Sequence, residues 1–146
     1  MNDAPAATLA DATDQAGTAL SWLSATFKGV SLNRGEIIVP RFGGIEARVR
    51  IPDADSEEAV EVSATVVVAN REHPLLPLIV AEGRRIFGSE IVVVSAGSES
   101  EVSLRRKVPR ALATEALLLE TVAEVGTASA YLHKELLPIL SPTAGR

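Results

Sequence analysis

Two neighbouring segments of this chain alternate strictly between apolar and polar residues, and this alternation constrains the fold more than any other feature. In residues 45–51, isoleucine, alanine and valine occupy every second position, and charged side chains lie between them. In residues 60–69, the side expected to face inward consists of Val60, Val62, Ala64, Val66 and Val68. Because successive side chains of a strand point to opposite faces, both segments are predicted to be antiparallel strands with one buried face.

Three further strands complete the predicted sheet. Residues 36–42 form an extended run, and the pair Gly43-Gly44 that follows favours a hairpin turn into the next strand. Residues 91–94 are continuously apolar, which is typical of a central strand that is covered on both faces. Residues 102–108 form the last strand and end before a proline. The expected sheet is therefore five-stranded.

Two shorter helices are predicted from apolar residues that recur about every 3.6 positions. The first begins near Thr8 and ends before Gly29, and its apolar face consists of Leu9, Ala16, Leu20, Leu23 and Phe27. The second begins between Pro74 and Pro77, because proline fits the first turn of a helix, and it ends at Gly88.

A third, long helix is predicted from about Thr114 to Leu140. Its apolar stripe steps alternately by four and three residues through Leu118, Val122, Val125, Ser129, Leu132, Leu136 and Ile139. Leu117, Leu119 and Leu137 fall off this stripe, so the helix either simply covers the sheet or also offers apolar surface to a partner. The fold class that results is α+β, a single antiparallel five-stranded sheet with three helices in the order α-β-β-β-α-β-β-α.

The length of 146 residues suits one domain. This domain is expected to span residues 8–140, between a flexible N-terminal tail at 1–7 and a flexible C-terminal tail at 141–146. No stretch reaches the roughly 20 apolar residues of a membrane span, and the acidic N-terminal region does not resemble a signal peptide. We therefore expect a cytoplasmic protein with no membrane partner.

Composition excludes several kinds of site. The chain has no cysteine, which excludes disulfides, thiolate metal sites and a cysteine nucleophile. Its net charge of −5 and its aromatic content of 3% argue against a nucleic-acid partner, because such proteins need a basic surface and stacking side chains.

No motif indicates catalysis, a cofactor or a metal. His73 and His133 lie far apart and belong to no spaced ligand set, so each is expected to be a surface or capping residue. The acidic segment 53–58 lacks the glycine and glutamate that a calcium loop requires, and a solvated turn fits it better. We therefore predict that the chain is not an enzyme, although an enzyme that uses scattered residues such as Glu82, Arg84 and Arg85 remains an alternative.

The chain has one basic cluster, formed by Arg105, Arg106, Lys107 and Arg110. It is expected either to protect an exposed or edge strand by its charge or to bind an acidic segment of a partner.

Residues 75–94 carry more large apolar side chains than one helical face can bury. This excess predicts a protein-binding or dimer interface that consists of Leu75, Leu78, Ile79, Ile86, Val92 and Val94.

The predicted order of elements, the small size, the acidic pI and the long leucine-rich final helix resemble the class I type III secretion chaperones. The YbjN family has a similar topology and a similar ending, with a strand at 101–108, Pro109 and a helix that contains VAEVGTASAYLHKEL. The chaperone resemblance implies a bacterial, cytosolic homodimer that binds an extended segment of a client protein without ATP. Possible client contacts would then be Leu20, Leu23, Phe27, Arg105 and Lys107. The YbjN resemblance implies a regulatory, sensory or accessory role.

Overall fold

The computed structural model describes residues 6–53, 55–86 and 89–140. Most of the two predicted tails, residues 1–7 and 141–146, therefore lies outside the described residues. The helices are α1 (Gln15–Thr26), α2 (Leu76–Ile86) and α3 (Glu115–Leu140), and short 3-10 helices occur at Leu9–Asp11 and Arg110–Leu112. The strands are β1 (Ser31–Asn33), β2 (Glu36–Phe42), β3 (Ile45–Arg50), β4 (Val60–Asn70), β5 (Glu90–Ala96) and β6 (Glu99–Val108).

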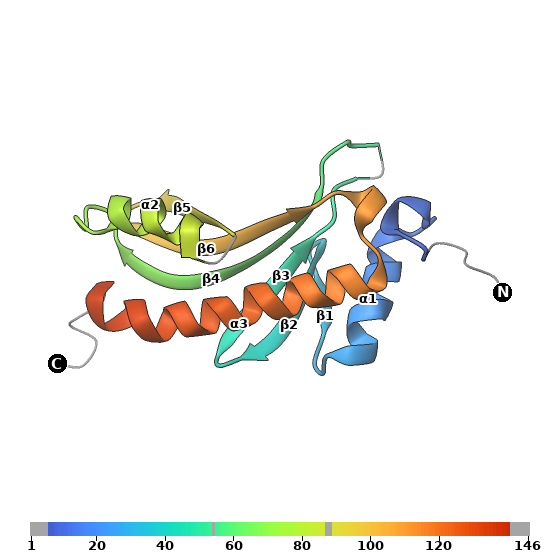
Figure 1. The fold of residues 1–146 in the computed structure, drawn as a ribbon, viewed down its shortest axis with the longest axis horizontal. Helices are drawn as coiled ribbons and strands as arrows, with labels where there is room; N and C mark the ends of the chain where they lie inside the picture. The colour runs from blue at the N-terminus through green and yellow to red at the C-terminus, as the bar shows by residue number, and fades with distance from the viewer. Residues whose placement is uncertain (1–5, 54, 87–88, 141–146) are drawn as a thin grey trace.

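These strands form one antiparallel sheet in the order β1-β2-β3-β4-β6-β5 (Figure 1). The α+β class, the single antiparallel sheet and the three helices are confirmed, but the sheet has six strands rather than five. The additional strand, β1, has three residues that are all exposed, so it carries no apolar alternation that could have predicted it. It is held by pairing with β2.

All three helices lie on one face of the sheet. Figure 1 shows α3 running along this face, with the two shorter helices toward opposite ends of the molecule. Leu118, Val122 and Val125 of α3 are fully buried against the sheet. Helix α2 lies over Val93 of β5. Val93 pairs with Val102 of β6, which is buried, so α2 is on the covered face as well. Within the described ranges, no helix has the length and apolar character needed to span a membrane.

A β-bulge changes which side chains of β4 face inward. The register of β4 against β6 shifts between Thr65 and Val67, and the alternation of buried residues changes phase at this point. Before the bulge, the inward-facing residues are Val60, Val62, Ala64 and Val66, as predicted. After the bulge, the inward-facing residues are Val67 and Ala69. Val68 therefore lies on the open face and is 43% exposed, so its predicted inward position is wrong.

The bulge is held by a contact from α3. The Nδ1 atom of His133 lies 2.6 Å from the main-chain oxygen of Val66, within hydrogen-bond distance. His133 is therefore neither a free surface residue nor a cap, because it joins the long helix to the irregular point of the sheet. His73 does have a capping role, since its Nδ1 atom accepts a hydrogen bond from the main-chain nitrogen of Leu75 just before α2.

The apolar stripe of α3 is confirmed as far as Leu136, and it then moves by one position. Ile139 is 47% exposed whereas Leu140 is buried. An α-helix has 3.6 residues per turn, so a stripe that repeats every 3.5 residues drifts around the helix over several turns. Leu117, Leu119 and Leu137 pack partly against the core, and thus add little free apolar surface.

Candidate binding surface

The open face of the sheet is charged at its centre, and these charges are paired within the chain. Arg50 donates a hydrogen bond of 2.9 Å to Glu61, and Arg105 forms ion pairs with Glu61 and Glu90. The hydrogen bond to Glu61 is the main cause that raises the pKa of Arg50 above its usual value. Since these cations already have acidic partners, the centre of the open face is poorly suited to a client segment that relies on ionic contacts.

The predicted basic cluster does not form a single patch. Arg106 points to the covered face and contacts Glu124 of α3, whereas Arg105 points to the open face. Arg110 donates to the main-chain oxygens of Asp53 and Glu58 and to the side chain of Gln15.

The edge-strand interpretation of this cluster is also wrong, because β6 lies between β4 and β5 in the sheet. Lys107 is exposed. Three of the four side chains are thus engaged inside the chain, and an acidic partner would have to displace these contacts.

The three positions in and just after α1 that were predicted to contact a client belong largely to the core. Leu23 is fully buried, and Leu20 and Phe27 are packed against the core. The ring of Phe27 lies 5.9 Å from the ring of Phe42 in β2, in a tilted arrangement. In this structure α1 therefore turns its apolar side toward its own domain, and these residues offer little surface to a partner.

Strand β5 is an edge strand, and the prediction that residues 91–94 form a central strand covered on both faces is wrong. In the described part of the chain, β5 pairs only with β6. Residues 91–96 contain no charged residue and no proline, so the unpaired edge lacks the features that usually prevent further strand pairing.

Exposed apolar side chains lie beside this edge on the open face of the sheet. Val94 is 56% exposed and Val92 is partly buried. Val94 and Val68 flank Glu101 in the same row of the sheet, so they share a face. The exposure of Val68 on this face was not predicted, because a pattern of alternation gives no sign of a bulge.

The α2 residues of the predicted interface lie on the other side of β5. Leu78 is 61% and Leu75 is 36% exposed, whereas Ile79 is packed partly against the core. The side chain of Ile86 lies outside the described residues. The predicted interface is therefore split into two apolar areas, with β5 between them. We call β5 together with Leu75 and Leu78 the β5 surface.

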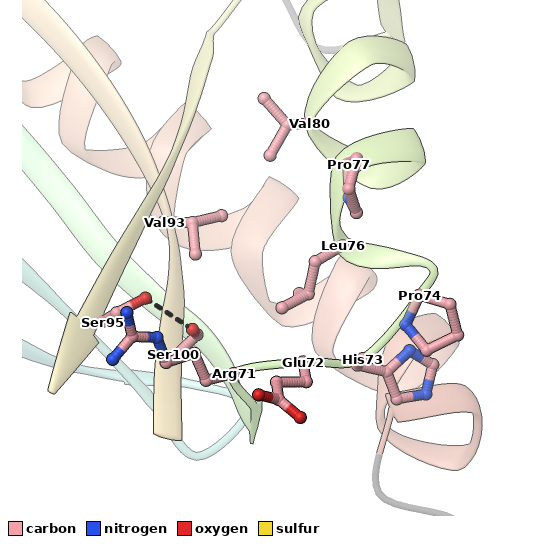
Figure 2. A pocket seen from close by; sticks show the side chains of 10 residues that line it. All are labelled: Arg71, Glu72, His73, Pro74, Leu76, Pro77, Val80, Val93, Ser95 and Ser100. Carbon is pink, nitrogen blue, oxygen red and sulfur yellow. Dashed lines mark hydrogen bonds between the residues drawn. The ribbon is translucent and has the colours of Figure 1, made fainter. Parts of the chain in front are cut away.

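A cavity of about 400 Å³ lies between α2 and the β5–β6 hairpin (Figure 2). Leu76 and Val80 of α2 and Val93 of β5 form its apolar part. Polar side chains occupy its other side, among them Arg71, Ser95 and Ser100. Sequence periodicity could not have revealed this cavity, because its walls come from segments whose relative placement is fixed only by the fold.

Among the described residues, no group of three or more histidine, aspartate and glutamate side chains is placed to hold a metal ion. The side chains of Glu82, Arg84 and Arg85, the residues of the enzyme alternative, lie outside the described residues.

No protein-family model matches the sequence, and no curated protein matches it. The fold is similar to the crystal structure of YbjN from E. coli, a protein described as a candidate transcription regulator. The two share 14% sequence identity over 89% of this chain and 94% of YbjN, with a TM-score of 0.56. At this level of identity the similarity concerns the fold alone, and the chain thus has a YbjN-like α+β fold.

Proposed function

We propose that this chain is a non-catalytic accessory or regulatory protein that works through protein contacts, as a homodimer joined at the β5 surface. The observation that carries the proposal is the unprotected edge of β5. An exposed edge strand that is long and apolar tends to pair with another strand, and soluble proteins usually shorten it, charge it or cover it. The opposite edge of the sheet is protected in this way, because β1 has only three residues.

The sequence of β5 is suited to pairing with a second copy of itself. In an antiparallel pair centred on Val93, Val92 of one copy faces Val94 of the other on the open face of the sheet. Glu90 faces Ala96, so the pairing places no two like charges opposite each other. Leu75 and Leu78 would extend the apolar contact on the side of α2, whereas Val68 lies in β4 and is separated from the β5 edge by Glu101 of β6.

The same edge could accept an extended segment of another protein, as in the chaperone-like interpretation, since strand addition depends mainly on main-chain hydrogen bonds. The self-complementary row of valines favours a second copy as the occupant. The YbjN-like fold supports a regulatory role over a chaperone role, and the net charge of −5 favours action through proteins rather than through nucleic acid.

The proposal is tested by the solution mass of the purified protein, measured by light scattering over a range of concentrations. We expect twice the chain mass of 15.3 kDa for the wild type and a monomer for Val94→Lys, which places a charge on the edge. The matched control is Leu112→Lys, at a residue that is 60% exposed and lies outside the β5 surface, and it should remain dimeric.

A wild type that is monomeric at every concentration would overturn the homodimer. A dimer that persists in both Val94→Lys and Val92→Lys would show that the subunits meet elsewhere. Polypeptides that co-purify with the wild type and the control, but not with the edge variants, would be identified by mass spectrometry as partners that need the same surface.

A further inference from the structure

We propose that the cavity between α2 and β5 binds a small amphipathic carboxylate, a molecule with an apolar chain and one anionic end. This inference goes beyond the proposed function, because it concerns a small ligand and does not require the dimer. Its basis is a cavity whose two sides differ in chemistry.

The apolar side of the cavity would hold the chain of the ligand. Figure 2 shows Leu76 and Val80 of α2 facing Val93 of β5 across the cavity. Its volume of about 400 Å³ lies within the range of roughly 300–1,000 Å³ that is typical of small-molecule sites. Since the cavity is open to solvent, the apolar chain can enter while the charged end stays near the mouth.

Arg71 supplies the positive charge for the anionic end. Its main-chain nitrogen is held by the oxygen of Ser98 at 2.9 Å, so the residue is fixed at the mouth of the cavity. The guanidinium group has five N–H donors, and its one described hydrogen bond is a long contact of 3.5 Å to the oxygen of Gly97. In contrast, Arg50 and Arg105 are held in ion pairs with glutamates.

Two serine hydroxyls lie on the same side of the cavity as Arg71. The Oγ atoms of Ser95 and Ser100 are 2.9 Å apart and form a hydrogen bond, shown as a dashed line in Figure 2. In such a pair only one hydroxyl hydrogen is used, so the other remains available to donate. Ser100 is almost fully buried and Ser95 is exposed, so Ser95 is the natural donor to a ligand that approaches from the mouth.

Glu72 limits the kind of ligand that fits. It is an exposed residue at the same mouth, and it would repel a second negative charge while leaving room for a single carboxylate on Arg71. Removal of this charge should therefore strengthen the binding of a carboxylate, whereas removal of Arg71 should weaken it. Neither change should affect an uncharged molecule with the same chain.

The experiment compares octanoate with octanol by titration of the 15N-labelled full chain, observed as amide chemical-shift changes in NMR. For a ligand with ten heavy atoms, a dissociation constant on the order of 1 mM or tighter is expected for octanoate. Shifts should be concentrated at Leu76, Val80, Val93 and Ser95. Arg71→Gln should weaken octanoate binding about five- to tenfold, and Glu72→Gln should strengthen it by about twofold or more.

The matched control is Arg48→Gln, which removes an exposed arginine on the open face of the sheet and should leave octanoate binding unchanged. Val80→Trp, which places a large ring in the cavity, should abolish binding of both molecules, and its fold is verified by circular dichroism. Absence of local shifts up to about 10 mM octanoate would overturn the proposal, as would equal effects of Arg71→Gln and Arg48→Gln. Val94→Lys should still bind octanoate, so that failure of the homodimer and failure of this site are distinguished.

Discussion

Gly126 of α3 lies directly against the ring of Phe42 in β2, and its replacement by alanine tests how tightly the helix and the sheet are packed. A Cβ atom at this position would lie 2.5 Å from Cγ of Phe42 and 2.6 Å from each Cδ atom of the ring. Carbon atoms that are not bonded normally approach to about 3.5–4.0 Å, so the ring would have to move by about 1 Å. Phe42 also contacts Phe27, and the movement would disturb this aromatic pair.

The change in stability caused by Gly126→Ala is the sum of three contributions to the free energy of unfolding. Alanine is favoured over glycine inside a helix by about 1 kcal/mol. Overpacking in a core typically costs about 1–3 kcal/mol, and the loss of an aromatic pair about 0.5–1.5 kcal/mol. We therefore expect Gly126→Ala to lower the stability by about 0.5–3.5 kcal/mol, with a corresponding decrease in Tm.

The assay is urea denaturation followed by circular dichroism, with a double-mutant cycle between Gly126→Ala and Phe42→Ala. In the background without the ring, Gly126→Ala should become stabilising by about 1 kcal/mol, because only the helix preference then remains. The control is Thr127→Ala at the next, exposed position, which should stabilise slightly. A stabilising Gly126→Ala in the wild-type background, or the same effect with and without the ring, would refute the packing argument.

Three further substitutions and one pH dependence test individual contacts by the same denaturation assay. Ser129 is fully buried and its hydroxyl has no hydrogen-bond partner among the described residues, so Ser129→Ala should leave the stability unchanged or raise it by up to about 1 kcal/mol, and a clear loss would contradict this expectation. His133→Ala should cost about 1–2 kcal/mol, since the Val66 oxygen at the bulge loses its partner, and an unchanged midpoint would count against this contact. Glu61→Gln should cost about 0.5–1 kcal/mol, because its partners are partly exposed, and an effect that does not diminish in about 1 M salt would not be ionic. The pKa of Arg50 is raised in the folded state. The contribution of Arg50 to the free energy of unfolding is therefore complete at neutral pH and is lost only as pH rises through the raised value. A slope in stability between about pH 6 and 9 that disappears in Arg50→Gln would contradict this expectation.

Much of the fold could be predicted from local patterns, because they report directly on burial. The bounds of β2 and nearly the whole of α3 follow from apolar spacing and turn residues. Local patterns could not predict a feature that depends on a neighbouring strand. The bulge in β4 arises from its pairing with β6, and it moves Val68 to the open face although the sequence continues to alternate.

The predicted interface shows the same limit at the level of a site. An excess of apolar side chains in residues 75–94 was visible in the sequence, and several of them are indeed exposed. Their division between two sides of β5 depends on the placement of α2 over the sheet, which no spacing encodes. The basic cluster resembles one unit in the sequence because most of its residues are adjacent, but in a strand adjacent side chains point to opposite faces. Arg105 and Arg106 therefore meet different glutamates.

The pairing of β4 with β6 also determines which parts of the domain can unfold separately. It joins residues that are distant in the sequence, since Val60 faces Val108 and Asn70 faces Glu99, whereas the β2–β3 and β5–β6 pairs are local hairpins. Both β4 and β6 are paired on two sides and lie beneath α3. In hydrogen exchange of a monomer such as the Val94→Lys variant, their amides should therefore exchange only when the whole domain unfolds, and those of β1 and β5 through smaller openings. Protection of β5 as strong as that of β4 would indicate that a second strand occupies its edge, which makes amide exchange an independent measure of assembly.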